Sequence, residues 1–165
     1  MIVIADSGPL RYFVVIEEVH LLPLLYGNIV IPPSVAHELT QAATPPLVRA
    51  WMEKLPEWMT VRSPRTALPE LSPVLGEGER EAIALAEELA ADVLLVDDEA
   101  ARLEAARRSI AVQGTLGILD LAAEHGFLTN LPGALEKLRS TNFRASKRLF
   151  DFFLERDAQR RRTGD

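Results

Sequence analysis

Short apolar segments alternate with segments of helical periodicity along this chain, and the alternation restricts the fold more than any other feature of the sequence. The expected strands are short and rich in β-branched residues, and they cover residues 2–6 (IVIAD), 29–31 (IVI), 93–96 (VLLV) and 109–113 (SIAVQ). Such uniformly apolar strands are typical of sheets that are buried on both faces. Strands that alternate with helices through short loops imply right-handed crossovers and parallel strands. The sequence therefore predicts an α/β fold with a parallel sheet that is covered on both faces.

Helix signals follow the expected strands. Ser7, in a Ser-Gly-Pro sequence, has the chemistry of a helix start. Ser34 follows a Pro-Pro stop and is expected to cap a helix that contains Glu38. Further helices are predicted at 78–90, 99–108 and 115–126, the last of them closed by Gly126. The proline-containing stretch 60–73 is predicted to be a surface loop.

The composition excludes several classes of protein. With 165 residues, of which 48% are apolar and 25% charged, the chain matches a soluble domain of ordinary size. It has no cysteine, so disulfide scaffolds, thiolate zinc sites and cysteine nucleophiles are excluded. No uncharged apolar run approaches the ~18 residues of a membrane-spanning helix, and Asp6 interrupts the first apolar segment where a signal peptide would continue. We therefore expect a cytoplasmic protein with no membrane partner.

The net charge of −6 hides an opposition between the body of the chain and its C-terminal tail. Residues 137–165 contain nine Lys or Arg against four Asp or Glu, whereas residues 1–136 contain nine against twenty. Apolar residues at helical spacing predict a basic, amphipathic helical extension at about 142–165. A solvated helix and an arm that binds a partner or nucleic acid both remain open. Arg144 and Lys147 are the candidates for contacts with phosphate groups.

Acidic residues end two of the expected strands. Asp6 closes the first strand, and Asp97 and Asp98 follow the third. The ligand crevice of a parallel sheet lies beyond the C-terminal ends of its strands, so we expect these carboxylates at one edge. Capping of the next helix is the alternative role for each of them.

Two glutamates on expected helices are turned toward the same edge. At ~100° per residue, Glu79 lies about 40° from the centre of the apolar face of its helix, and Glu38 lies on the flank of such a face. A lone buried carboxylate is costly, and crowded carboxylates repel each other unless a proton or a cation neutralises them. Oxygen ligands suit Mg²⁺ or Mn²⁺ rather than zinc, and metals held by carboxylates typically act on phosphates. The pattern therefore predicts a site for a hard divalent cation.

Five motifs lie in a specific order between Ile2 and about Leu128: IADSGPL (4–10), IPPSVAHEL (31–39), GEGEREAIALA (76–86), LLVDDEAAR (94–102) and GTLGIL (114–119). In this order they resemble the PIN-domain ribonucleases, and within them a prokaryotic branch that is similar to the VapC toxins. The resemblance implies a single PIN-like domain over 1–165, with a three-layer α/β/α fold around a central parallel sheet. It also implies an acidic pocket that holds Mg²⁺ or Mn²⁺, and endonucleolytic cleavage of RNA by metal-activated water.

The four acids of that family, carried over by position, fall on Asp6, Glu38, Glu79 and Asp98, with Asp97 as a near neighbour. The resemblance implies that Asp6 and Asp98 bind the metal directly, and that Glu38 and Glu79 bind a metal or orient its waters. Glu79 is one methylene longer than the aspartate that is usual in the toxins.

Other positions follow from the same resemblance. Ser7 falls on a small hydroxyl position beside the first aspartate and, with Arg144 and Lys147, is a candidate for substrate binding. Thr115 belongs to a Gly-Thr pair typical of this branch, and we expect it to cap the next helix.

The expected partners are an RNA substrate, an antitoxin protein and a second copy of the chain, because the toxins that this chain resembles bind an antitoxin helix and often dimerise. A role as the toxin of a toxin–antitoxin pair follows. The alternative is a catalytically weak module of the same fold that works by binding RNA or a partner. Mn²⁺-dependent cleavage of single-stranded RNA, lost with EDTA, separates the two.

Overall fold

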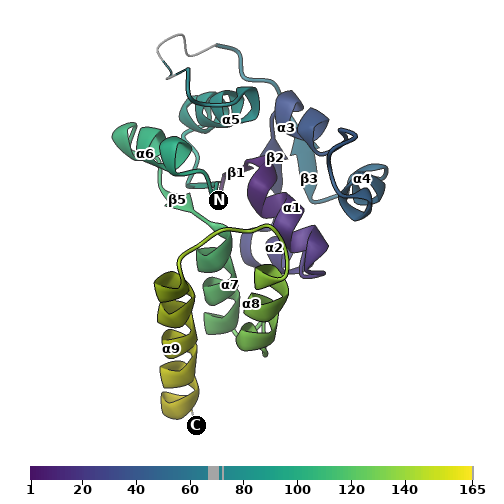
Figure 1. Ribbon diagram of the computed structural model, residues 1–165. Helices are drawn as coiled ribbons and strands as arrows, with labels where there is room; N and C mark the ends of the chain where they lie inside the picture. Colours follow the sequence, from purple (N-terminus) through teal and green to yellow (C-terminus); the bar gives the residue numbers. More distant parts are fainter. Residues whose placement is uncertain (67–70, 72, 165) are drawn as a thin grey trace.

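The computed structural model describes residues 1–66, 71 and 73–164, which form an all-parallel sheet with helices on both faces (Figure 1). The strands are β1 (Val3–Ala5), β2 (Ile29–Ile31), β3 (Met59–Val61), β4 (Val93–Leu95) and β5 (Val112–Gln113). Their spatial order is β3-β2-β1-β4-β5, and every pair of neighbours is parallel. The predicted α/β fold with a central parallel sheet is therefore confirmed.

Helices follow the strands where the sequence has helix signals, and three short helices lie between them. They are α1 (Ser7–Val15), α2 (Leu21–Tyr26), α3 (Pro33–Glu38), α4 (Pro46–Met52), α5 (Glu77–Glu88), α6 (Glu99–Arg107), α7 (Thr115–Glu124), α8 (Leu131–Arg139) and α9 (Lys147–Thr163). Helices α2, α4 and α8 lie outside the predicted helices, although Pro46 and the cap Asn130 are start signals for α4 and α8. Within the described part of the chain, no helix has the length and apolar character to cross a membrane.

The side chains of the strands alternate between two hydrophobic cores, as the two-residue period of a strand requires. Val3 and Ala5 pack with Phe13 of α1 and with α2, α7 and α8 on one face of the sheet. Ile4 and Leu94 pack with α5 and α6 on the other face, and Figure 1 shows these two helices apart from α7 and α8. The sheet is thus the middle of three layers.

No apolar pattern predicts the edge strand β3. Met59 is buried, but Thr60 and Val61 are exposed, so the strand has no face of alternating apolar residues. It is nevertheless paired with β2 along its length. The loop predicted over 60–73 is therefore wrong at its first two positions, and 67–70 and 72 lie outside the described residues.

The start of α3 also differs from the prediction. Pro32 is the N-cap and Pro33 is the first helical residue, so Ser34 lies inside the first turn and does not cap the helix. The fixed φ of proline suits the first helical position, which explains the earlier start. The prediction for Gly126 is confirmed, because it follows the last turn of α7 with φ 78°, a conformation that favours glycine.

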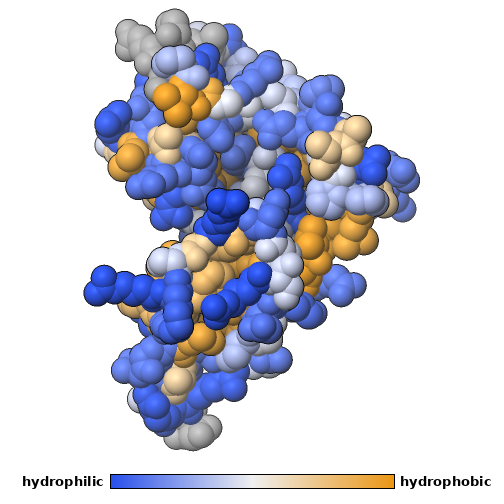
Figure 2. All heavy atoms as spheres, viewed as in Figure 1, coloured by the Kyte–Doolittle hydropathy of each residue, from blue (hydrophilic) through white to orange (hydrophobic). Residues whose placement is uncertain are grey.

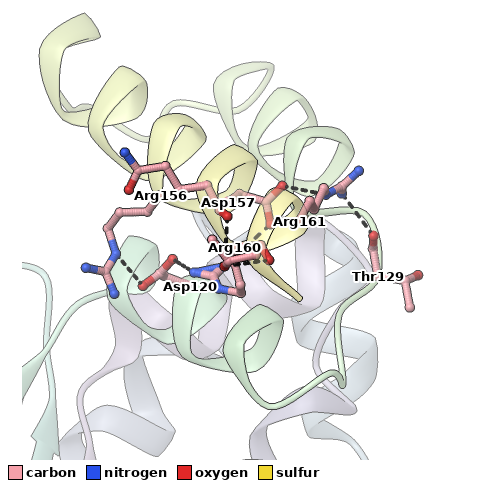
Figure 3. Close-up of polar contacts among 8 residues, drawn as sticks. Asp120, Thr129, Arg156, Asp157, Arg160 and Arg161 are labelled. Atoms are coloured by element: carbon pink, nitrogen blue, oxygen red, sulfur yellow. Dashed lines mark hydrogen bonds and ion pairs between the residues drawn. The ribbon is translucent and has the colours of Figure 1, made fainter. Parts of the chain in front are cut away.

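Buried ion pairs fix the C-terminal helix α9 to α7 (Figure 3). Asp120 of α7 is only 6% exposed, and it accepts hydrogen bonds from Arg156 Nε at 3.2 Å and from Arg160 Nη2 at 2.6 Å. Asp157 of α9 is also buried and pairs with Arg160 and Arg161 of the same helix. Much of the positive charge of the tail is therefore neutralised by ion pairs within the protein, and α9 is held along α7.

Candidate functional site

The strand order brings the ends of β1 and β4 together at the centre of the sheet. From β1 the chain continues to β2 and β3 on one side, whereas β5 lies beyond β4 on the other side. β1 and β4 are direct neighbours, with Ile4 beside Leu94. The connections diverge at such a point, and open parallel sheets bind ligands in the crevice that results. Asp6 follows β1, and Asp97 and Asp98 follow β4, so all three acids lie at this crevice.

Asp6 is a buried carboxylate with an unsatisfied oxygen. Its side chain is at the N-cap of α1 but makes no capping hydrogen bond, and the residue is 5% exposed. Oδ1 is buried without a hydrogen-bond partner in the described part of the chain. Burial raises the pKa of Asp6 to about 7, with further increases from the nearby Glu79, Glu38 and Asp97, against a smaller lowering by the Ser7 backbone N–H. The Asp6 carboxyl therefore keeps its proton to a much higher pH than an ordinary aspartate does.

Glu38, the last residue of α3, is held against the first turns of two other helices. Its Oε2 accepts a hydrogen bond from Ser7 Oγ of α1 at 2.7 Å. On α5, a Cβ atom added to Gly78 would overlap Glu38 Oε1. The glycine between the two acids of the sequence Glu-Gly-Glu therefore allows the Glu38 carboxylate to approach α5, and Ser7 orients it.

Glu79 lies in the first turn of α5 and is half-buried. Its Oε2 accepts a hydrogen bond from the Gly76 backbone N–H at 3.1 Å, which caps the helix. Burial raises the pKa of Glu79, and the nearby Asp98 and Glu38 raise it further, whereas the Gly76 hydrogen bond lowers it. The residue thus lies on the inward side of its helix, within electrostatic reach of the other acids.

The two adjacent aspartates after β4 have different surroundings. Asp97 accepts hydrogen bonds from the Thr115 backbone N–H at 2.7 Å and from Thr115 Oγ1 at 2.6 Å. A Cβ atom added to Gly8 would be 3.3 Å from Asp97 Oδ2, so this carboxylate lies against the start of α1, next to Asp6. Asp98 is exposed, and its Oδ2 caps α6 by accepting from the Ala101 backbone N–H at 3.0 Å.

Electrostatics separate these two aspartates further. Burial raises the pKa of Asp97, and the two Thr115 hydrogen bonds and the nearby Arg102 oppose this effect. The negative charge of Asp97 raises the pKa of Asp6, whereas the negative charge of Asp98 raises the pKa of Glu79. The crevice therefore gathers five carboxylates, of which Asp97 is the strand-end partner of Asp6.

The donor set fits a hard cation in its chemistry. Among the described residues, no three His, Asp or Glu side chains already stand close enough to hold a metal ion. Every donor is a carboxylate or hydroxyl oxygen, which is the set that Mg²⁺ and Mn²⁺ prefer. The partnerless Oδ1 of Asp6 and the raised pKa values of Asp6 and Glu79, to which neighbouring carboxylates contribute, are what crowded carboxylates should display.

The other residues predicted for the site make different contacts in the structure. Ser7 contacts Glu38 rather than open solvent, and Lys147 pairs with Asp151 of α9 at 2.8 Å. Arg144 lines a cavity that also includes Asp97. The expectation for Thr115 as a cap is wrong, because Gly114 is the N-cap of α7 and Thr115 holds Asp97 instead.

One residue beside the crevice has no signal in the sequence. Arg102 lies four residues after the capping Asp98, on α6, and lines the same cavity as Arg144. Its position on the surface of a helix gives no pattern by which a sequence could single it out.

Comparisons with known proteins agree with this architecture. A family model described as DUF3368, PIN domain, matches residues 2–159. Among solved structures, the chain is similar to a PilT N-terminus domain protein from the hyperthermophilic archaeon Sulfolobus solfataricus P2, with 17% identity and a TM-score of 0.56. That match covers 76% of this chain and 96% of the other. No curated protein matches significantly.

Proposed function

Since the chain belongs to the PIN-domain family, whose fold is typically that of a nuclease, we propose that it is an endoribonuclease that depends on Mg²⁺ or Mn²⁺ and cleaves RNA phosphodiester bonds. The observation that carries the proposal is the buried Asp6, with a partnerless oxygen, among the carboxylates at the end of β1 and β4. A divalent cation supplies the neutralising charge there and, when bound, polarises the scissile phosphate and activates a water molecule.

The residues of the chain have distinct roles in this proposal. Asp6, Glu38 and Glu79 would hold the cation together with Asp97, and Asp98 would act mainly through its cap and its charge. Ser7 Oγ positions Glu38, and Thr115 positions Asp97. With its pKa raised to about 7, Asp6 would hold a proton in part of the molecules at neutral pH and would give it up in order to bind the cation. Product ends of the 5′-phosphate and 3′-hydroxyl type are expected.

Cleavage of a labelled single-stranded RNA by the purified protein tests the proposal. Mn²⁺ or Mg²⁺ should be required and EDTA should stop the reaction. Asp6→Asn should abolish cleavage without unfolding the protein. Asp92→Asn is the matched control, because Asp92 is an exposed aspartate that precedes β4 at the opposite edge of the sheet. Equal activity of Asp6→Asn and the wild type would refute the proposal.

The alternative is a module of this fold that binds RNA or a partner with little catalysis. It is favoured by the absence, among the described residues, of three acids already close enough for a metal ion. Wild-type protein that binds RNA but does not cleave it in Mn²⁺ would select this alternative. The toxin role, the antitoxin partner and the homodimer stay predictions from the resemblance.

A further inference from the structure

A cavity of about 500 Å³ opens beside the carboxylates, between the start of α7, the start of α6 and the segment that leads into α9. Its wall includes two aromatic rings, an aliphatic side chain and two cationic side chains: Phe143, Phe153, Leu149, Arg102 and Arg144. In Figure 2, hydrophobic surface is exposed near the start of α9, with strongly hydrophilic side chains around it. The cavity therefore combines an apolar wall with a cationic rim.

The aromatic wall is held in place by the fold. Phe143 makes edge-to-face contacts with Tyr12 and Phe150, at ring-centroid distances of 5.0 and 6.3 Å. Phe153 is half-buried and packs against the core, while Leu149 is 42% exposed. A planar ligand would thus meet a surface that loses little conformational entropy on binding.

The cations at the rim are available to a ligand. Neither Arg102 nor Arg144 forms a hydrogen bond or ion pair in the described part of the chain, although Arg102 is close enough to Asp97 to lower its pKa. Arg156 and Arg160 of α9 differ, since both are bound to Asp120. The lining also contains the carboxylates of Asp97 and Glu99, so only the part of the rim that carries Arg102 and Arg144 suits an anionic group.

The cavity is continuous with the candidate site, because Asp97 belongs to both. A ligand in the cavity lies next to the carboxylates, which would repel a phosphate group. Cations near this boundary would offset that repulsion. An occupant with one planar apolar part and one adjacent anionic part satisfies both surfaces.

We propose that this cavity binds one unstacked nucleobase of single-stranded RNA, with Phe143 and Phe153 against the base and with Arg102 and Arg144 on the phosphate beside it. The choice of RNA rests on the proposed function. A base in a duplex is stacked and paired and does not reach such a cavity, whereas single strands are bound through aromatic contacts and cations. The cavity thus selects an unpaired nucleotide next to the bond that is cut.

Binding of a fluorescent single-stranded RNA oligonucleotide in EDTA tests this assignment without requiring cleavage. Phe153→Ala should weaken binding about tenfold. Leu149→Glu should have a similar effect and is safer for the fold, because Leu149 is largely outside the core. Arg144→Ala should reduce the slope of log K against log salt by about 0.7. Phe127→Ala and Arg148→Ala are matched controls, because both residues are exposed, do not line the cavity and should leave binding unchanged.

The results separate this assignment from the proposed function. Wild-type affinity in Phe153→Ala and Leu149→Glu, or equal affinity for a duplex of the same sequence, would overturn the assignment even if the protein cleaves RNA. A cavity that binds a peptide partner instead would give that result. Binding that depends on the cavity residues, without any cleavage in Mn²⁺, would support the assignment and contradict the nuclease.

Discussion

Replacement of Asp6 by asparagine should stabilise the protein at neutral and alkaline pH when divalent cations are absent. Asp6 is 5% exposed, and its pKa is raised from 3.8 to about 7, first by burial and then by nearby carboxylates. The folded protein therefore holds the charged form of this side chain at a cost. Asparagine has nearly the same shape, keeps an oxygen that accepts from the Ser7 N–H, and carries no charge.

The magnitude follows from the linkage between protonation and folding. Because the pKa of Asp6 is higher in the folded protein than the ordinary 3.8 of the unfolded chain, the unfolded chain loses the proton first as the pH rises. The stability supplied by the proton is complete below pH 3.8 and is lost as the pH rises through about 7. At about 1.36 kcal/mol per pH unit, the whole loss is about 4 kcal/mol, of which about 2.5 kcal/mol falls between about pH 5 and about pH 8.

Urea unfolding in EDTA at these two pH values measures the effect. The free energy of unfolding of Asp6→Asn, relative to wild type, should increase by about 2.5 kcal/mol from the lower pH to the higher. The same comparison for the exposed Asp92→Asn should show no such change. A difference between Asp6→Asn and wild type that is independent of pH would mean that this carboxylate is neither desolvated nor crowded, and would refute the reasoning.

Three further predictions concern the cation, the paired aspartates and the tail. In a thermal-shift assay, Mn²⁺ should raise the unfolding temperature of the wild type. The increase should be larger at higher pH, because the proton on Asp6 competes with the ion. Asp6→Asn should lose this increase. Asp97→Asn should reduce RNA cleavage at least tenfold, whereas Asp98→Asn should keep most of the cleavage activity. Asp98→Asn should also change the free energy of unfolding by less than about 0.5 kcal/mol, since asparagine caps helices as well as aspartate does. Comparable losses of cleavage in both variants would contradict this assignment. Asp120→Ala should destabilise the protein by about 2 kcal/mol in urea unfolding, below the cost of breaking a fully buried pair, because Arg156 remains half-exposed. An unchanged midpoint would show that the Asp120 pairs do not hold α9 in place.

The proximity of Asp6 to the acids after β4 could be predicted from the sequence, because the C-terminal ends of neighbouring parallel strands meet at one edge. Helical periodicity could likewise place Glu79 on the inward side of α5. Both inferences use local patterns whose geometry is fixed by the secondary structure alone. They needed no knowledge of how distant segments pack.

The distinction between Asp97 and Asp98 could not be predicted in that way. Adjacent residues in a loop have no periodic rule, and the surroundings of Asp97 depend on Thr115, which is 18 residues further along the chain. The edge strand β3 escaped prediction for a related reason, since Thr60 and Val61 are exposed and only pairing with β2 makes them a strand. The cavity is also a product of packing, because its walls come from α6, α7 and α9.

Ion pairs between α9 and α7 join the basic tail of the chain to its acidic body. A tail that simply attracted RNA would leave its arginines in solvent, yet Asp120 binds Arg156 and Arg160 across 36 and 40 residues. These contacts fix α9 along α7 and thereby fix the segment before it, which carries Arg144 at the rim of the cavity. Loss of the Asp120 pairs should therefore weaken RNA binding through the misplacement of Arg144, even though it frees two arginines and makes the tail more cationic. An increase in RNA affinity in Asp120→Ala would instead mean that the tail attracts RNA by its net charge alone.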